Sequence, residues 1–96
     1  MYPTASKKEA RQAFEIFGHI PGVGKSLSVD LWELGFRSME QLATGQPAEM
    51  FEKTRQLAGG TMDRCVLYVY RCAVAYANNP DLDPELKKWW NWKDQP

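Results

Sequence analysis

Apolar residues recur at spacings of three and four along most of the chain, which is the pattern of helices that bury one face. No segment alternates apolar and polar residues over the length of a surface strand, and no heptad repeat is present. Glycine, proline and capping residues divide the pattern into segments. We therefore predict a compact all-α domain of five or six helices. They cover about residues 7–17, Lys25 to the residue before Gly35, Ser38 to Gly45, Pro47 to the residue before Gly59, Thr61 or Asp63 to about Ala77, and Pro84 through Trp90.

Capping signals mark where several of these helices begin. Ser6 followed three residues later by Glu9 fits a capping box, in which each side chain bonds the backbone amide of the other residue. Ser38 and Gln41 repeat that spacing. Asp83 directly before a proline suits the N-cap of the last helix. The boundaries therefore rest on local chemistry as well as on periodicity.

The predicted helix that ends near Ala77 is apolar nearly all round, which is typical of the central helix of a small domain. Its β-branched residues leave a buried strand over residues 66–70 as an alternative. The other helices each have one apolar face. The residues expected on those faces are Ala10, Ala13, Phe14, Phe17, Leu27, Leu31, Leu34, Met39, Leu42, Met50, Phe51, Thr54, Leu57, Leu86, Trp89 and Trp90.

The chain has 96 residues, with 12 Lys and Arg against 12 Asp and Glu, and its formal net charge is zero. A chain of this length buries roughly 60–65% of its unfolded surface, which allows one core and excludes a large multi-part enzyme. We expect a single domain over residues 1–96 with its core over about 7–94. Neutrality argues against coating nucleic acid or an anionic membrane through bulk charge. Any bound anion must be held by local groups.

Cys65 and Cys72 are the two cysteines, too few for a disulfide framework and spaced unlike a zinc site. They lie two helical turns apart, and we expect both to be small apolar core residues, with redox sensing as the alternative. The N-terminus has no apolar stretch long enough for a signal peptide or a membrane span. The sequence thus predicts a cytoplasmic protein with no membrane association, metal or cofactor.

Gly22-Val23-Gly24-Lys25 between the first two helices is the most informative segment. Glycines let a ligand approach the main chain, and the amides at the start of a helix favour an anion such as phosphate. We expect Val23 to point inward and Lys25 and Ser26 to face outward as a cation and a hydroxyl donor. The candidate phosphate site is therefore Gly22, Val23, Gly24, Lys25 and Ser26. The alternative is a tight turn between helices that binds nothing.

A second glycine pair, Gly59-Gly60, also separates two predicted helices, so the fold is either a single such unit or a degenerate tandem pair. Arg55 and Arg64 flank this turn and are secondary candidates for phosphate contacts. The nearby acidic residue Asp63 argues against them, since a carboxylate there repels phosphate. His19, just before the first turn, is a further secondary candidate, with an ordinary surface histidine as the alternative.

The tail is rich in tryptophan and lysine. Exposed indoles could stack on bases while the lysines contact a backbone. Packing is the other interpretation, since a short last helix needs large side chains to hold it, and we expect at least two indoles to pack. The residues are Lys87, Lys88, Trp89, Trp90, Trp92 and Lys93.

The segment from Ile20 to Lys25, with the leucine face of the helix after it, resembles the helix-hairpin-helix motif of DNA-binding proteins. That motif has an apolar-Gly-apolar-Gly turn and a small residue four positions after the second glycine. Ser28 stands there in place of the usual alanine, and Leu27 stands where a polar residue is common. Both departures are mild for packing, although Leu27 removes one possible phosphate donor.

Longer segments resemble a narrower group, the small bacterial helix-hairpin-helix proteins of the pathogenicity-locus family, some of them labelled mitomycin-resistance proteins. The resemblance covers about residues 7–94. It rests on Ile20 to Gly24, Leu31 to Gly35, Asp63 to Val74 and Lys88 to Asp94.

The helix-hairpin-helix resemblance implies sequence-independent binding of the DNA backbone by the amides of Gly22, Val23 and Gly24, helped by Lys25. With few charges, such binding would be weak, near the non-specific range of about 10⁻⁴ to 10⁻⁶ M. Related glycosylases add a catalytic Asp in a cleft between domains, which this chain does not supply, so we predict no enzyme. An accessory role in DNA repair or the stress response fits. The alternative is a protein-interaction module that docks a protein partner on the Trp-rich tail, with the hairpin purely structural.

Overall fold

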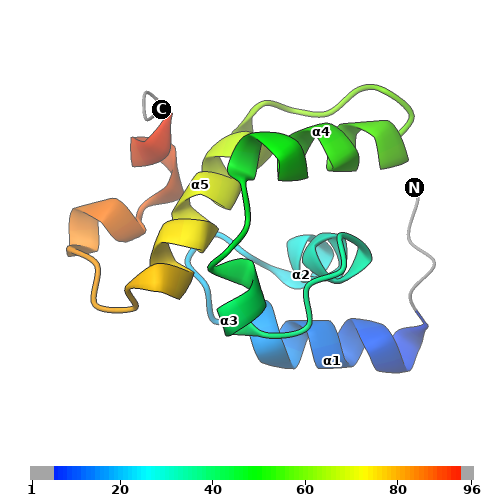
Figure 1. Ribbon diagram of the computed structural model, residues 1–96, viewed down its shortest axis with the longest axis horizontal. Helices are drawn as coiled ribbons and strands as arrows, with labels where there is room; N and C mark the ends of the chain where they lie inside the picture. The colour runs from blue at the N-terminus through cyan, green and yellow to red at the C-terminus, as the bar shows by residue number, and fades with distance from the viewer. Residues whose placement is uncertain (1–5, 94–96) are drawn as a thin grey trace.

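Five α-helices and two short 3-10 helices are found in residues 6–93, the part of the chain that the computed structural model describes, and this part contains no strand (Figure 1). The all-α prediction is confirmed, and residues 66–70 lie inside a helix rather than a strand. None of the described helices is long and apolar enough to cross a membrane. The helices are α1 (Lys7–Phe17), α2 (Lys25–Glu33), α3 (Met39–Leu42), α4 (Pro47–Leu57), α5 (Cys65–Asn78), η1 (Pro84–Lys87) and η2 (Trp89–Trp92).

The capping signals act as the sequence predicts at the start of α1. The amide of Glu9 donates to Ser6 Oγ at 3.1 Å, and the amide of Ser6 donates to Glu9 Oε1 at 3.0 Å. At α3 the second box forms only in half. Ser38 Oγ accepts from the amide of Gln41 at 3.1 Å, but Gln41 Oε1 accepts from the amide of Arg37 at 2.6 Å.

The tail differs from the single last helix that the sequence predicts. Asp83 does cap it, since its Oδ1 accepts from the amide of Glu85 at 2.9 Å. The chain then forms two 3-10 turns separated by the extended residue Lys88. Trp92 Nε1 donates to the carbonyl of Leu86 at 2.7 Å, and Asn91 Nδ2 donates to the carbonyl of Glu85 at 2.8 Å. Side chains thus satisfy carbonyls that a continuous helix would bond with its own amides.

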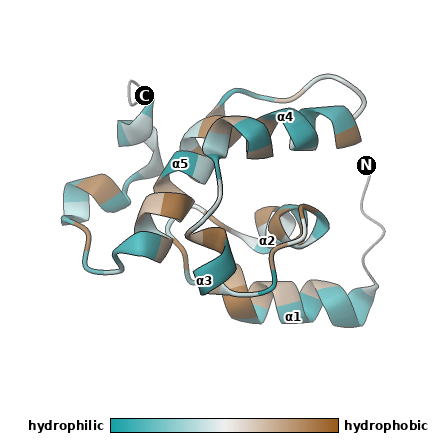
Figure 2. Cartoon of the chain, in the orientation of Figure 1, coloured by the Kyte–Doolittle hydropathy of each residue, from teal (hydrophilic) through white to brown (hydrophobic). Residues whose placement is uncertain are grey.

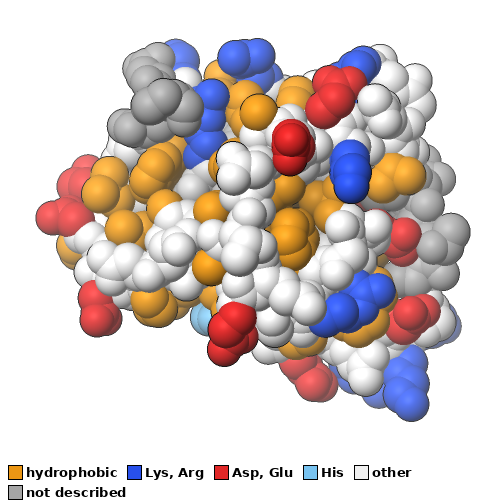
Figure 3. Space-filling model, in the orientation of Figure 1, with side chains coloured by type: hydrophobic (Ala, Val, Ile, Leu, Met, Phe, Trp, Pro, Cys, Tyr) orange, Lys and Arg blue, Asp and Glu red, His pale blue; other side chains and the backbone are white. Residues whose placement is uncertain are grey.

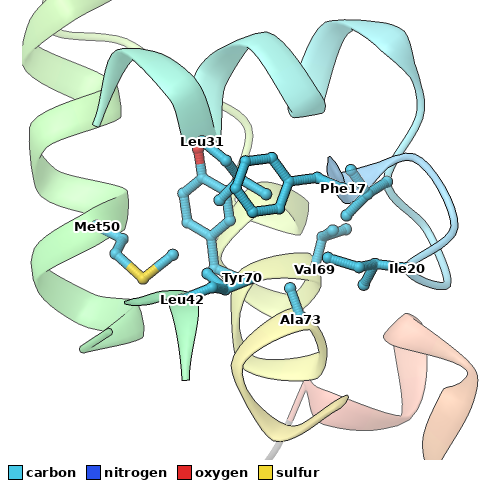
Figure 4. Packing of buried hydrophobic residues seen from close by; sticks show 9 residues of the cluster. Phe17, Ile20, Leu31, Leu42, Met50, Val69, Tyr70 and Ala73 are labelled. Atoms are coloured by element: carbon cyan, nitrogen blue, oxygen red, sulfur yellow. The ribbon is translucent and has the colours of Figure 1, made fainter. Parts of the chain in front are cut away.

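The core is built around α5, which packs against α3, α4 and the two 3-10 helices. Hydrophobic residues of α3 and α5 lie side by side in Figure 2. Every α-helix contributes, and so does the turn between α1 and α2 (Figure 4). The central position predicted for this helix is confirmed. The buried cluster consists of Phe17, Ile20, Val23, Leu31, Leu42, Met50, Val69, Tyr70 and Ala73.

Four residues expected on the core faces are instead exposed. Phe14 is 40% exposed and Leu57 is 45% exposed, while Leu86 and Trp90 are 36% and 56% exposed. Phe14 lies over the end of α1, where its ring is within 2.6 Å of the place that a Cβ on Gly18 would take. Leu57 is the last residue of α4, where the helix leaves the core. Periodicity identifies the face of a helix but not how far the core reaches along it.

The two cysteines also separate, which corrects the prediction that both are core residues. Cys72 is buried, and its Sγ lies 3.6 Å from the carbonyl oxygen of Leu86 in the tail. Burial raises the pKa of the Cys72 thiol. Cys65 is exposed because it is the first residue of α5 and projects where the preceding loop joins the helix. The helix face that carries both cysteines therefore extends past the edge of the core, and Cys65 lies on the part outside it.

One hydrogen bond between side chains joins α4 to α5 inside the core. Thr54 Oγ1 and Tyr70 Oη lie 2.7 Å apart, and both residues are buried. Burial raises the pKa of the Tyr70 phenol, so the hydroxyl stays neutral. Each hydroxyl satisfies the other where water cannot.

Replacing both partners should cost less stability than the sum of the losses when each is replaced alone. Thr54→Val leaves the Tyr70 hydroxyl buried without this bond, and we expect the free energy of unfolding to fall by about 1–3 kcal/mol. The double variant Thr54→Val/Tyr70→Phe should lose less than the sum of the two single variants, because no hydroxyl is left unsatisfied. Urea denaturation followed by tryptophan fluorescence measures all three. Strictly additive losses would contradict the coupling.

Asp30 on α2 is a second buried polar group, only 7% exposed. Loss of hydration, reinforced by the charge of Glu33, raises the pKa of its carboxyl from near 3.8 to about 6. The folded protein therefore holds a proton that the unfolded chain releases near pH 4. It follows that the contribution of Asp30 makes the fold less stable as pH rises from about 4 to about 6.

Asp30→Asn removes this titration. We expect the stability of the variant relative to the wild type to increase between pH 4 and pH 7, by up to about 3 kcal/mol for a pKa difference of about 2. Urea unfolding at intervals of pH measures the difference. A difference that does not change with pH would show that the carboxyl has an ordinary pKa.

Candidate functional site

The turn between α1 and α2, residues 18–24, is anchored in the core at two points. Ile20 is 2% exposed and Val23 is 5% exposed, which confirms that Val23 points inward. The amide of Ile20 donates to the carbonyl of Phe17 at 3.1 Å, and the amide of Val23 donates to the carbonyl of Ile20 at 3.0 Å. Apolar burial and two backbone bonds therefore fix the path of the turn.

The remaining residues of the candidate site face outward. Gly22, Gly24, Lys25 and Ser26 are all exposed. Within the described residues, no group accepts a hydrogen bond from the backbone amide of any of these four. The amide of Val23 is already engaged in the turn, so this residue serves the site through its buried side chain. Four neighbouring amides at the start of a helix can together receive one anion.

Among the five described α-helices, α2 alone begins with neither a side-chain acceptor nor a proline. Its N-cap, Gly24, has no side chain to turn back on the amides. Serines cap α1 and α3, Pro47 begins α4 without an amide to satisfy, and Asp63 Oδ1 accepts from the first amide of α5 at 2.9 Å. No side chain of the described residues therefore caps the positive end of α2, which is open to a ligand.

Ser28 orients the backbone at Gly24. Its side chain is fully buried, and its Oγ donates to the carbonyl of Gly24 at 2.8 Å while its amide donates to the same oxygen at 2.9 Å. Two donors thus hold this carbonyl toward the helix. A small residue is required at position 28, and serine fits there because its hydroxyl has a partner.

Gly22 is required for two reasons. Its φ is 84°, in the left-handed region that side chains disfavour. A Cβ on Gly22 would also lie 2.7 Å from Cδ1 of Trp89, which belongs to η2 and packs against the turn. The sequence predicts that at least two of the indoles pack, but it carries no signal that one of them would contact Gly22.

The tail is held beside the turn by further contacts. Trp89 and Trp92 are half-buried, which confirms that at least two indoles pack, whereas Trp90 is 56% exposed. Arg71 Nη1 donates to the carbonyl of Trp92 at 2.9 Å, so α5 holds η2 directly. A role for Arg71 in anchoring the tail was not evident from the sequence because the contact joins segments far apart in the chain.

The secondary candidates are dispersed. His19 is exposed at the start of the turn, with its ring 6.0 Å from that of Tyr76 in an edge-on contact. Arg55 forms an ion pair with Glu52, and its Nη1 donates to the carbonyl of Gly60 at 2.7 Å. Arg64 is exposed at the start of α5. These three side chains do not form one site.

The second turn differs from the first in its chemistry. Gly59 and Gly60 both have positive φ, 91° and 101°, and no buried apolar residue separates them. The carboxylate of Asp63 already occupies the first amide of the next helix, and this bond lowers its pKa. In Figure 1 the loop between α4 and α5 leads into one end of α5, while the turn between α1 and α2 lies toward its other end. The two turns therefore do not form a shared anion site.

Charges of both signs lie interspersed on the face of the molecule that Figure 3 shows. Lys25 forms no ion pair with any described residue, whereas Lys88 in the tail is paired with Glu85 at 2.8 Å. The turn therefore offers oriented amides beside one lysine that pairs with no described carboxylate.

Comparison with protein-family models matches residues 10–96 to the family described as Pathogenicity locus. The comparisons with curated proteins and with solved structures give no match.

The two glycines of the turn should respond differently to substitution. Gly22→Ala places a Cβ at positive φ and against Trp89, and we expect it to lower the free energy of unfolding by about 2 kcal/mol or more. Gly24→Ala is the matched control, since its φ is −96° and nothing lies within 4 Å of its Cβ position. We expect a loss below about 1 kcal/mol. Equal losses in urea unfolding would contradict the contact with Trp89.

Proposed function

The chain belongs to the pathogenicity-locus family, whose model matches residues 10–96, and we propose that it binds the DNA backbone without reading sequence. In this proposal α1, the turn and α2 act as a helix-hairpin-helix. The amides of Gly22, Gly24, Lys25 and Ser26 donate to phosphate oxygens, and the Lys25 ammonium and Ser26 hydroxyl add to them. The observation that carries the proposal is the uncapped start of α2, beside a turn that Ile20 and Val23 fix in place.

Backbone amides are compatible with a protein of zero net charge, because their partial charges do not enter the charge count. Phosphate is common to every nucleotide, so such a site has no means of distinguishing base sequence. With one lysine at the turn, few counterions are released, and we expect weak binding with a shallow dependence on salt. Useful affinity would then come from a partner, a dimer or a structured DNA.

The arrangement of the helices favours a degenerate tandem pair with one working site. The connections between α1 and α2 and between α4 and α5 are both seven residues long, and α1 and α4 both have 11 residues. The second connection has Asp63 where a phosphate would bind. We propose that the second unit is structural and that the protein holds DNA without catalysis, in an accessory role in repair or the stress response in the cytoplasm.

A protein-interaction module is the second candidate. Leu86 and Trp90 leave apolar surface exposed on the tail, at 36% and 56% of their area. Tryptophan is common among the residues at the centre of protein interfaces. In this alternative the tail docks on a protein partner and the turn has only a structural role.

Variants at Lys25 separate the contribution of its backbone amide to DNA binding from the contribution of its side-chain charge. Lys25→Gln removes the charge, and we expect it to weaken binding of labelled duplex DNA by about two- to fivefold at low salt. Lys25→Pro removes the amide as well, and we expect a further loss of about tenfold. Proline is compatible with the first position of α2, since Gly24 before it is extended, at φ −96° and ψ −162°.

Lys53→Gln on α4 is the control for charge, because Lys53 is exposed and remote from the turn in sequence. We expect it to bind DNA as the wild type does. The proposal fails if the wild type shows no binding at low salt, or if Lys25→Pro binds as well as Lys25→Gln. Circular dichroism of each variant verifies that α2 is retained.

A further inference from the structure

Trp90 presents an exposed indole beside the turn. It is 56% exposed, although its neighbours Trp89 and Trp92 are half-buried. Its ring centroid lies 5.7 Å from that of Trp89, and Trp89 packs on Gly22. A single side chain therefore separates the exposed indole from the amides of the candidate phosphate site.

The position of this indole is fixed by its surroundings. Arg71 bonds the carbonyl of Trp92 at 2.9 Å, and Trp92 Nε1 bonds the carbonyl of Leu86 at 2.7 Å, so the turn of η2 that carries Trp90 is held from both sides. The rings of Trp89 and Trp90 meet at 86°. An edge-to-face contact of this kind engages at most one face of Trp90, which leaves the other face for a ligand.

We propose that Trp90 stacks on an unpaired base adjacent to the phosphate held by the turn, so that this surface selects DNA with a single-stranded gap or overhang over continuous duplex. The inference rests on the proposed function. Bases inside a duplex stack on one another and offer no face to an indole, whereas an unpaired base does. Stacking tolerates any base, since each has a π face, and so it matches a site that reads no sequence.

The charges of the tail are compatible with this role. Lys88 is paired with Glu85, whereas Lys87 and Lys93 form no ion pair with any described residue. They leave cations on both sides of Trp90 in the sequence, suited to the phosphates that flank a stacked base. The aromatic surface and the amides of the turn would then hold neighbouring parts of one strand.

The test compares two labelled DNAs, a continuous duplex and the same duplex with a short single-stranded gap, by fluorescence anisotropy with the full chain. We expect the wild type to bind the gapped DNA about fivefold more tightly or better. Trp90→Ala should abolish this preference and leave affinity for the continuous duplex unchanged. Trp90→Phe, which keeps an aromatic face, should retain part of it.

Leu57→Ala is the matched control, since Leu57 is 45% exposed and lies on α4, and it should keep the full preference. The inference is overturned if the wild type shows no preference, or if Trp90→Ala keeps it. The second result would favour a protein partner for the indole.

Lys25→Gln in the same assay separates the two proposals. If it weakens duplex binding while no preference exists, only the role of Trp90 fails; if Lys25 has no effect on either DNA, both fail.

Discussion

Burial of Ile20 and Val23 is the constraint on which the candidate site depends. Both residues belong to a turn, yet they lie in the same cluster as Phe17, Leu31 and Tyr70 (Figure 4). Because both side chains are packed in the core, the path of the backbone between and after them is fixed, with its free amides facing outward. These two anchors lie between α1 and α2, which pack against each other, and Gly24 then begins α2 without a side-chain cap. If the turn binds phosphate as we propose, its order in the free protein lowers the ordering cost of binding.

The start of α5 shows by contrast what the start of α2 lacks. Asp63 places a carboxylate on the first amide of α5, where it stabilises the helix and excludes a second anion. Gly24 provides no such group, so the partial positive charge of α2 stays uncompensated within the described residues. A protein of zero net charge can therefore still hold an anion at one helix start. In this account, neutrality limits affinity to what a few oriented dipoles supply, and the contact of Trp89 with Gly22 adds an aromatic surface beside them.

Local signals made much of the fold predictable. Ser6 and Glu9 form the capping box that their spacing indicates, and Asp83 caps the tail as its place before a proline indicates. Val23 points inward as its place between two glycines predicts. The features that could not be predicted depend on contacts between distant segments. The break of the tail at Lys88, the position of Trp89 on Gly22 and the bonds of Arg71 to the tail all join residues that no periodicity connects. The exposure of Cys65 and Leu57 depends on where the core ends, which a repeating pattern does not encode.

The most direct measurement is the change in backbone amide chemical shifts when isotope-labelled protein is titrated with duplex DNA at low salt. We expect the largest changes at Gly22, Gly24, Lys25 and Ser26, whose amides have no acceptor among the described residues. The amide of Cys65, which is bonded to Asp63, should stay unchanged. Two results would contradict DNA binding at the turn. In the first, DNA binds while the amide shifts of residues 22–26 stay unchanged. In the second, only residues 86–93 respond.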